Sequence, residues 1–224
     1  MVQDNYLYFF GGNPNQSEAS LDFAKKAGGK HAKIALLIIY RQGWEEYLPR
    51  YTDPWIRAGV QPQNIDVIIP NQHGELNVDQ TIHTLQEATG IYIGGGHTET
   101  YHATYVKEPY KSIMQEKYYA GTPIAGNSAG ALLLTDQVVL SSIDTDSGET
   151  IHLHGLGFVQ DILISVHYSK WNDAEHLKGS LANTRISTGY GIDDHACLVV
   201  KNGRFHKALG EEKVFVVVKN EKSS

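Results

Sequence analysis

The chain has 224 residues, of which 41% are hydrophobic and 20% charged, and its formal net charge is −6. The acidic balance disfavours a nucleic-acid partner, and no apolar stretch reaches the length of a transmembrane helix. The first residues lack the basic and apolar segments of a secretory signal. Cys197 is the single cysteine, which excludes an internal disulfide and a multi-cysteine metal site. A cytoplasmic enzyme fits these features, and we expect one domain over residues 1–224 with no membrane partner.

The first half of the chain alternates short apolar runs with helix-like segments. The apolar runs predict strands at 6–10, 33–40, 66–70 and 91–93. The segments between them predict helices at 18–26, 44–58, 78–88, 98–105 and 110–119. The unbroken run 34–39 is typical of a strand that is buried on both faces. This alternation predicts an α/β fold, with right-handed β-α-β units around a mostly parallel sheet flanked by helices.

After residue 134 the pattern changes. The apolar runs 136–142 and 162–166 predict strands, the polar segment 144–155 predicts a loop, and 173–182 predicts a helix. The tail predicts a C-terminal β-meander with strands at 196–200, 205–209 and 214–218. The Asn202-Gly203 pair between the first two of these strands is a strong hairpin signal.

The segment around Ser128 predicts a strand, a tight turn and a helix, with the serine at the apex. Gly126, Ser128 and Gly130 have the G-x-S-x-G spacing of a nucleophile elbow, where small neighbours avoid clashes at a sharp bend. The helix N-terminus would then offer the Ala129 amide to an oxyanion. The alternative is a small-residue turn that carries an inert serine.

A second glycine-rich segment, Gly94–Gly96, also follows a predicted strand. The carboxyl ends of parallel strands meet at one edge of a sheet, and sites form there. We therefore expect Gly94–Gly96 to lie near Ser128 and to offer a backbone amide as the second oxyanion donor. The alternative is that the glycines form only a flexible connection.

A serine nucleophile needs a histidine base and an acid that orients the base. His167 closes an apolar strand and is the leading candidate for the base, while His97 directly follows the triple glycine and could also reach the elbow. For the acid, the spacing does not choose among Asp193-Asp194 and the loop residues Asp144 and Asp146. His152 and His154 have no third ligand nearby in the sequence, so we expect no metal.

Five segments, taken in order, resemble peptidase family S51, whose members include aspartyl dipeptidase and cyanophycinase. The segments are Gly94–Gly96, Gly126–Ala131, Gly155–Phe158, His167-Tyr168 and Gly191–Ala196. The resemblance runs through nearly the whole chain, from about residue 6 to residue 218. It implies a fold like that of the class I glutamine amidotransferases, with a flavodoxin-like core and a serine in place of the elbow cysteine.

The resemblance implies a role for each candidate of the triad. Ser128 matches the family nucleophile, and His167 matches the family histidine, with Tyr168 in place of the phenylalanine that follows it. Asp194 matches the acid of cyanophycinase-like members, which is a glutamate there, and Asp144 is nearest to the aspartate that dipeptidase-like members use. The Gly-Ile-Asp-Asp context favours Asp194 over Asp144.

The resemblance also implies the groups that surround the nucleophile. Gly96 and Ala129 would supply the two oxyanion amides. Asn127 and His97 are expected to contact the substrate. Binding of an N-terminal aspartate needs a cation, and three basic residues could supply it: Lys170, Lys178 and Arg185. We take Lys170 as the substrate-binding candidate.

These observations lead to a serine-type peptidase that hydrolyses small peptides, as an exopeptidase or dipeptidase, through an acyl-enzyme and without a cofactor. Two alternatives stay open. One is an esterase of the α/β-hydrolase type that uses Ser128, Asp144 and His167 in that order. The other is a non-catalytic protein that binds a small molecule on the same scaffold. The sequence is compatible with a homodimer, and its aromatic segment 44–55 can be an interface, a lid or, by default, part of the core.

Overall fold

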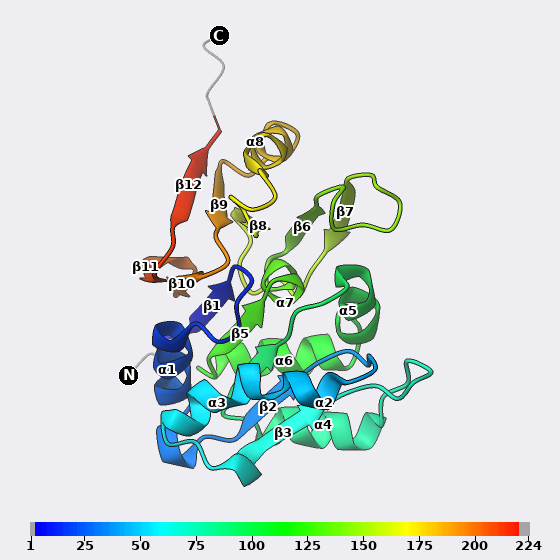
Figure 1. Ribbon diagram of the computed structural model, residues 1–224, viewed down its shortest axis with the longest axis vertical. Helices are drawn as coiled ribbons and strands as arrows, with labels where there is room; N and C mark the ends of the chain where they lie inside the picture. Colours follow the sequence, from blue (N-terminus) through cyan, green and yellow to red (C-terminus); the bar gives the residue numbers. More distant parts are fainter. Residues whose placement is uncertain (1–2, 220–224) are drawn as a thin grey trace.

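A central sheet of seven strands organises the computed structural model, which describes residues 3–219 (Figure 1). The spatial order is β11 (Arg204–Gly210), β10 (Ala196–Lys201), β1 (Tyr6–Phe10), β5 (Ile124–Asn127), β4 (Gly90–Ile93), β2 (Ile34–Leu37) and β3 (Ile65–Ile68). The five strands from β1 to β3 are parallel, and the β10–β11 hairpin joins them through an antiparallel pair with β1. The α/β fold with a mostly parallel sheet is therefore confirmed.

Helices cover both faces of this sheet. One face carries α1 (Ser17–Lys26), α2 (Trp44–Tyr47) and α3 (Pro49–Arg57). The other carries α4 (Val78–Glu87), α5 (Thr98–Tyr105), α6 (Tyr110–Tyr119) and α7 (Ala129–Leu133). Short 3-10 turns lie at Gly29–His31 and Pro62–Asn64. Alternate side chains of β1 enter the two cores, because successive residues of a strand point to opposite faces.

A smaller layer packs beyond the carboxyl ends of strands β1 and β5 of the central sheet (Figure 1). It contains a three-stranded sheet in the order β12 (Val214–Val218), β9 (Thr188–Ile192) and β8 (Ile162–Val166), which α8 (Ala174–Ala182) covers. A separate antiparallel pair is formed by β6 (Gln137–Leu140) and β7 (Ile151–His154). The strands β8 and β9 are parallel, with Val166 paired with Ile192.

Three local predictions need correction. The expected C-terminal meander is wrong for its third strand, because β12 pairs with β9 and not with β11. Phe215 and Val217 on one face of β12 pack against the small third core, whereas Val216 and Val218 on the other face are exposed. The polar segment 144–155 contains β7, and β9 was not predicted, because its glycines weaken the strand pattern.

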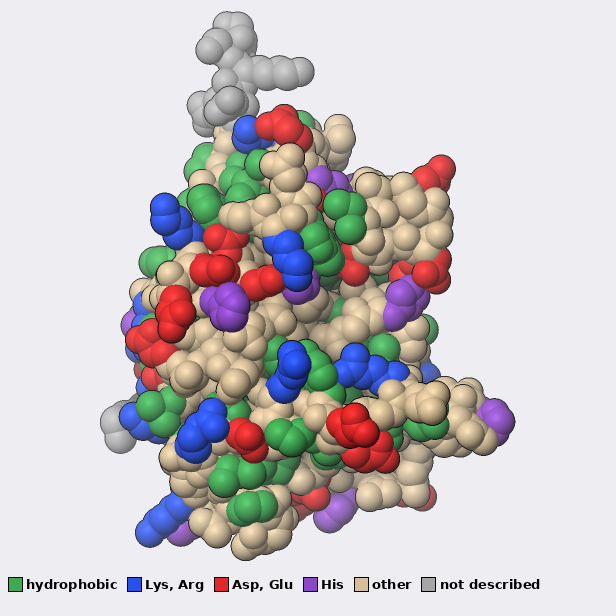
Figure 2. Space-filling model, viewed as in Figure 1, with side chains coloured by type: hydrophobic (Ala, Val, Ile, Leu, Met, Phe, Trp, Pro, Cys, Tyr) green, Lys and Arg blue, Asp and Glu red, His purple; other side chains and the backbone are tan. Residues whose placement is uncertain are grey.

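The aromatic segment 44–55 divides between core and surface. Trp55 and Tyr51 are buried in the core of the α1–α3 face, as the default interpretation expects. Trp44 and Tyr47 are half-buried and line a pocket that is described below. Between residues 3 and 219, no helix is both long and apolar enough to span a membrane. Figure 2 shows acidic, basic and histidine side chains interspersed on one face of the molecule.

Candidate active site

Ser128 occupies a sharp turn between β5 and α7, as the G-x-S-x-G spacing predicts. Its φ of 50° and ψ of −113° are unusual for a residue with a side chain. The two flanking glycines are required by packing. A Cβ on Gly126 would overlap the backbone of Gly130, and one on Gly130 would overlap the Ile93 carbonyl. The turn is therefore a strained elbow with closely packed neighbours.

His167 and Asp194 complete a chain of hydrogen bonds that begins at Ser128. Oγ of Ser128 lies 2.8 Å from Nε2 of His167, and Nδ1 of His167 hydrogen-bonds Oδ1 of Asp194. The His167 and Asp194 side chains are 15% and 24% exposed, so the pair is largely shielded yet reachable from solvent. This is the order of groups found in serine hydrolases: hydroxyl, imidazole and carboxylate.

The other candidate acids have different partners. Oδ2 of Asp144 accepts a hydrogen bond of 2.7 Å from the Thr98 hydroxyl, and burial raises the pKa of Asp144 although this hydrogen bond opposes the rise. Oδ1 of Asp193 accepts the Ser169 N–H at 2.9 Å. Among the three, Asp194 is the carboxylate that contacts His167.

Lys170 lies beside Asp194. Its Nζ is 3.2 Å from Oδ2 of Asp194, the oxygen that His167 does not use. Burial opposes ionisation of Asp194, but the hydrogen bonds from His167 and Lys170 outweigh this effect and lower the pKa of its carboxyl. The structure thus places Lys170 beside Asp194, a contact that was not predicted from the sequence.

The last residue of β1 and the loop that follows it bind the backbone of all three residues. The Phe10 carbonyl accepts the Ser128 N–H at 3.0 Å, and the Gly11 carbonyl accepts the His167 N–H at 3.1 Å. The Asn13 N–H donates to the Asp194 carbonyl at 2.8 Å. This loop joins three elements that are far apart in the sequence.

Gly12 lies in this loop, directly against the imidazole and the carboxylate. A Cβ at Gly12 would overlap Cε1 of His167 and Oδ1 of Asp194. Sequence reasoning missed this residue, although two glycines at the end of a predicted strand were a usable signal. Gly12 therefore makes room for the His167–Asp194 hydrogen bond.

Trp171 covers the imidazole. The ring centroids of His167 and Trp171 are 4.4 Å apart. The backbone N–H of Trp171 donates to the backbone carbonyl of His167 at 2.8 Å. His167 itself has a φ of 50°, in the left-handed region. A strained residue that packing and hydrogen bonds hold in place is typical of a functional site. No pattern in the sequence indicated this role for Trp171.

Two backbone amides near Ser128 are available for hydrogen bonding. Within the described part of the chain, the N–H groups of Gly96 and Ala129 have no hydrogen-bond partner. The Gly95 N–H is used, because it donates to the Tyr51 hydroxyl at 2.9 Å. Gly96 has a φ of 155° and is exposed. The two amides proposed as oxyanion donors therefore have no hydrogen-bond partner among the residues that the structure describes.

Asn127 ends β5 and is buried directly before Ser128. Its Nδ2 packs against Gly95, where a Cβ would lie 2.6 Å away. Its Oδ1 is buried and has no hydrogen-bond partner among residues 3–219. Asn127 therefore packs against the Gly94–Gly96 segment, and its Oδ1 has no hydrogen-bond partner in the described part of the chain.

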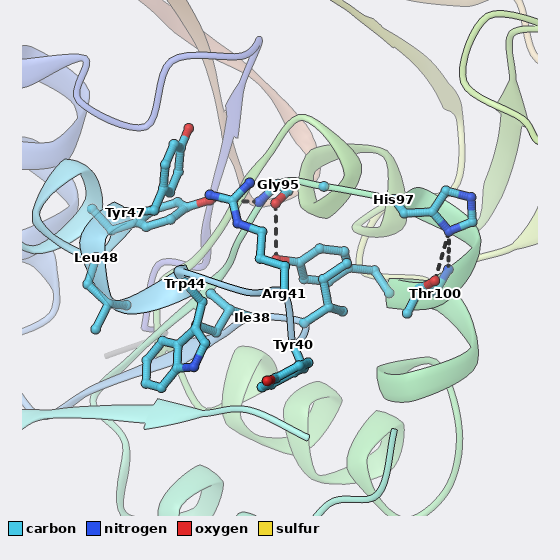
Figure 3. Close-up of a pocket in the computed structure, with 13 residues that line it drawn as sticks. Ile38, Tyr40, Arg41, Trp44, Tyr47, Leu48, Gly95, His97 and Thr100 are labelled. Atoms are coloured by element: carbon cyan, nitrogen blue, oxygen red, sulfur yellow. Dashed lines mark hydrogen bonds between the residues drawn. The ribbon is translucent and has the colours of Figure 1, made fainter. Parts of the chain in front are cut away.

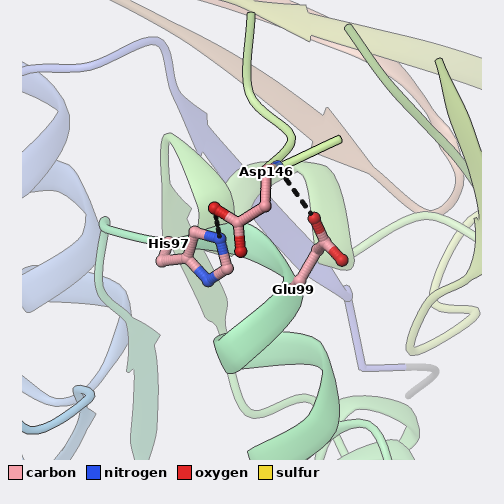
Figure 4. Close-up of side chains that lie close together, drawn as sticks. All are labelled: His97, Glu99 and Asp146. Atoms are coloured by element: carbon pink, nitrogen blue, oxygen red, sulfur yellow. Dashed lines mark hydrogen bonds and ion pairs between the residues drawn. The ribbon is translucent and has the colours of Figure 1, made fainter. Parts of the chain in front are cut away.

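His97 belongs to a charged cluster at the start of α5 (Figure 4). Its Nδ1 accepts the Thr100 N–H and so caps the helix, and its Nε2 lies 3.2 Å from Oδ1 of Asp146. Ligand atoms of His97, Glu99 and Asp146 lie within 4.8 Å of one another. Within residues 3–219 this is the group that could hold a metal ion, with one nitrogen and two carboxylates as ligands.

A pocket of about 370 Å³ opens beside the Gly95–His97 segment (Figure 3). Its walls come from the loop after β2, the helices α2 and α3, and the first turns of α5. The pocket shares Gly95 with the elbow, because a Cβ at Gly95 would lie 3.3 Å from Cβ of Ser128. The nucleophile candidate and the pocket are therefore neighbours.

Three curated relatives match most of the chain. Cyanophycinases from Synechococcus elongatus and Thermosynechococcus vestitus are each 24% identical over 199 residues, which is 87% of this chain and 61% of the relative. The chain thus spans about 61% of the length of these cyanophycinases. An uncharacterized peptidase, YgaJ, from Bacillus subtilis is 25% identical over 166 residues, with coverage of 74% and 67%.

Two solved structures have the same fold. A peptidase from an acI-B1 Actinobacterium superimposes with a TM-score of 0.72 at 18% identity, covering 98% of this chain and 96% of that one. A putative peptidase E protein from Listeria monocytogenes EGD-e gives 0.65 at 15% identity, with coverage of 97% and 100%. The fold of this chain is thus one that solved structures described as peptidases also have. The chain belongs to peptidase family S51, whose family model matches residues 11–208.

Proposed function

We propose that this protein is a serine peptidase that hydrolyses small peptides through Ser128, His167 and Asp194. The observation that carries the proposal is the 2.8 Å contact between Oγ of Ser128 and Nε2 of His167, with Asp194 on the other ring nitrogen. A serine hydroxyl becomes a useful nucleophile when an adjacent base can accept its proton. The free amides of Gly96 and Ala129 support the same assignment.

The reaction proceeds in two halves. Oγ of Ser128 attacks the peptide carbonyl carbon while Nε2 of His167 takes the hydroxyl proton, and the carbonyl oxygen becomes an oxyanion. The Gly96 and Ala129 amides donate hydrogen bonds to that oxygen. His167 then gives its proton to the leaving amine, which departs and leaves an acyl-enzyme. His167 then takes a proton from water, which attacks the ester carbonyl carbon. As the bond to Oγ of Ser128 breaks, His167 returns that proton to Oγ, and the acid is released.

Asp194 holds His167 in the tautomer that presents an unprotonated Nε2 to the serine. The Nδ1–H of His167 donates to Oδ1 of Asp194, so the carboxylate also stabilises the imidazolium that forms during attack. The acid follows the histidine in the chain, whereas α/β-hydrolases have the order Ser, acid, His. This difference argues against the esterase alternative that would use Asp144.

The substrate class is a short peptide, in accordance with the family. The test is hydrolysis of a dipeptide and tripeptide library, followed by mass spectrometry, with the wild type and Ser128→Ala. We expect cleaved products with the wild type and a loss of about 10⁴-fold or more with the variant. Equal activity of the two proteins would overturn the role of Ser128.

A further inference from the structure

The pocket beside Gly96 has a mostly apolar and aromatic lining. Trp44, Tyr47, Tyr51 and Tyr101 contribute rings, and Ile38 and Leu48 contribute aliphatic side chains. None of its 13 lining residues is an aspartate or a glutamate. Its volume of about 370 Å³ falls within the range of ligand sites, which is roughly 300–1,000 Å³. A ligand that fills it needs a large apolar body.

Two pocket tyrosines are tied to the backbone that faces Ser128. The Tyr51 hydroxyl accepts the Gly95 N–H at 2.9 Å, and the Tyr101 hydroxyl donates to the Gly95 carbonyl at 3.3 Å. Burial raises the pKa of Tyr51 to about 12, so its hydroxyl stays neutral at physiological pH. A group bound in the pocket therefore lies against the same peptide unit that orients the Gly96 amide.

Arg41 is the cation of the pocket. Its guanidinium carbon lies 4.3 Å from the centroid of the Tyr47 ring, and Figure 3 shows the guanidinium directed toward Gly95. Within residues 3–219, no carboxylate lies within 4.0 Å of Arg41. A guanidinium fits a carboxylate with two parallel hydrogen bonds. The pocket thus offers an uncompensated positive charge next to aromatic walls.

We propose that this pocket binds the C-terminal residue of the peptide substrate, with a large apolar or aromatic side chain against the rings and the free α-carboxylate on Arg41. One such residue supplies both the apolar body and the anion that the pocket matches. A short acidic side chain would satisfy Arg41 but would leave most of the aromatic wall uncovered. This inference rests on the proposed function and names the substrate class of the same site.

Binding to Ser128→Ala, measured by titration calorimetry, tests the inference without hydrolysis of the peptide. The probes are Ala-Phe, Ala-Phe amide, Ala-Ala and Asp-Ala amide. We expect Ala-Phe to bind about 10- to 100-fold more tightly than Ala-Phe amide, the range for a charge-assisted hydrogen-bond pair. We also expect Ala-Phe to bind more tightly than Ala-Ala, because the ring fills the apolar wall.

Two arginine variants locate the effect. Arg41→Gln should reduce the preference for Ala-Phe over its amide to about 1. Arg50→Gln is the matched control, because Arg50 also lies over the Tyr47 ring, at 4.9 Å, but does not line the pocket. Arg50→Gln should keep the full preference for Ala-Phe over Ala-Phe amide.

Several outcomes would overturn the inference. They are equal affinity for Ala-Phe and its amide, an equal loss in both arginine variants, tightest binding of Asp-Ala amide, and no saturable binding of any probe. Failure of the proposed function gives a different result: the wild type would not cleave peptides, while the preference for Ala-Phe and its dependence on Arg41 would still be measurable.

Discussion

The Nζ atom of Lys170 lies 3.2 Å from Oδ2 of Asp194, on the carboxylate oxygen opposite the one that contacts His167. One carboxylate thus holds an imidazole and an ammonium group at the same time. The ammonium group favours the ionised form of Asp194 and contributes to its lowered pKa. Because Lys170 is exposed, solvent and salt screen this effect.

Replacement of Lys170 tests this contribution. In Lys170→Met the pKa of Asp194 should rise toward its usual value, because one of the groups that lower it is removed. A depressed carboxyl pKa favours the active, ionised form until the pH falls through that pKa. The loss of kcat/KM in acid should therefore begin at a higher pH in the variant, and added salt should reduce the difference between the two proteins.

Lys178→Met is the control for that experiment, because Lys178 pairs with Glu175 at 2.8 Å on the exposed face of α8. It removes the same charge without touching Asp194. A pH profile of kcat/KM that moves equally in both variants would show a general charge effect and would contradict a specific role for Lys170.

The choice between the two candidate acids has its own prediction. Asp194→Asn should lower kcat by about 10⁴-fold, because the amide cannot hold His167 in the required tautomer. Asp144→Asn should keep activity within a few-fold, since Asp144 bonds Thr98 and its burial already disfavours the charged form. Steady-state kinetics on the two matched variants decides the point, and a larger loss in Asp144→Asn would reverse the assignment.

Gly12 gives a prediction about packing. Gly12→Ala adds one methyl group that would overlap His167 and Asp194, so the hydrogen bond between them must break or shift. We expect a fall of roughly 10²- to 10⁴-fold in kcat while the protein stays folded. Gly179→Ala in α8 is the control, because a Cβ there meets nothing within 4 Å. Circular dichroism checks the fold, and normal activity of Gly12→Ala would contradict the account.

Tyr51 gives a prediction about stability. Tyr51→Phe leaves the Gly95 N–H without its acceptor, which should cost about 1–3 kcal/mol of unfolding free energy. The rate should also fall, because the Gly96 amide is less firmly oriented. Tyr119→Phe, at a side chain that is 63% exposed, should change neither quantity. Urea denaturation gives the free energies, and equal stability of the two variants would show that the Tyr51 contact contributes little.

The elbow and the glycine segment were predictable because local rules specify them. The G-x-S-x-G spacing identifies a turn that only small neighbours allow, and both glycine segments follow apolar runs of a parallel sheet. The same reasoning placed His167 at the end of β8. These features depend on residues that are close together in the chain.

Residue spacing alone could not select Asp194, although the family resemblance favoured it, because its contact with His167 depends on the pairing of two strands. His167 directly follows β8, and Asp194 follows β9 by two residues. The parallel register that pairs Val166 with Ile192 brings these two strand ends together. Because β9 contains two glycines, it was not recognised as a strand, and its pairing with β8 could not be predicted.

The contacts of the loop after β1 could not be predicted from the sequence for a related reason. Gly12 lies near Ser128 because β1, which precedes it, pairs with β5 in the sheet. The Gly11 carbonyl accepts the N–H of His167, which belongs to the smaller layer. The strand order in space is not the order in the chain, so no spacing in the sequence reports it. The contacts of Lys170 with Asp194 and of Trp171 with His167 could not be predicted either, because they depend on the turn that follows His167.

Activation of Ser128 is tested most directly by mass spectrometry after treatment of the folded protein with a fluorophosphonate, on the wild type and on Ser128→Ala. We expect a covalent adduct on the peptide that contains Ser128 in the wild type, and no adduct on the alanine variant. Labelling should also fall strongly in His167→Ala, because the base is lost. An unlabelled wild type, or labelling that persists in Ser128→Ala, would contradict the claim that Ser128 is an activated nucleophile.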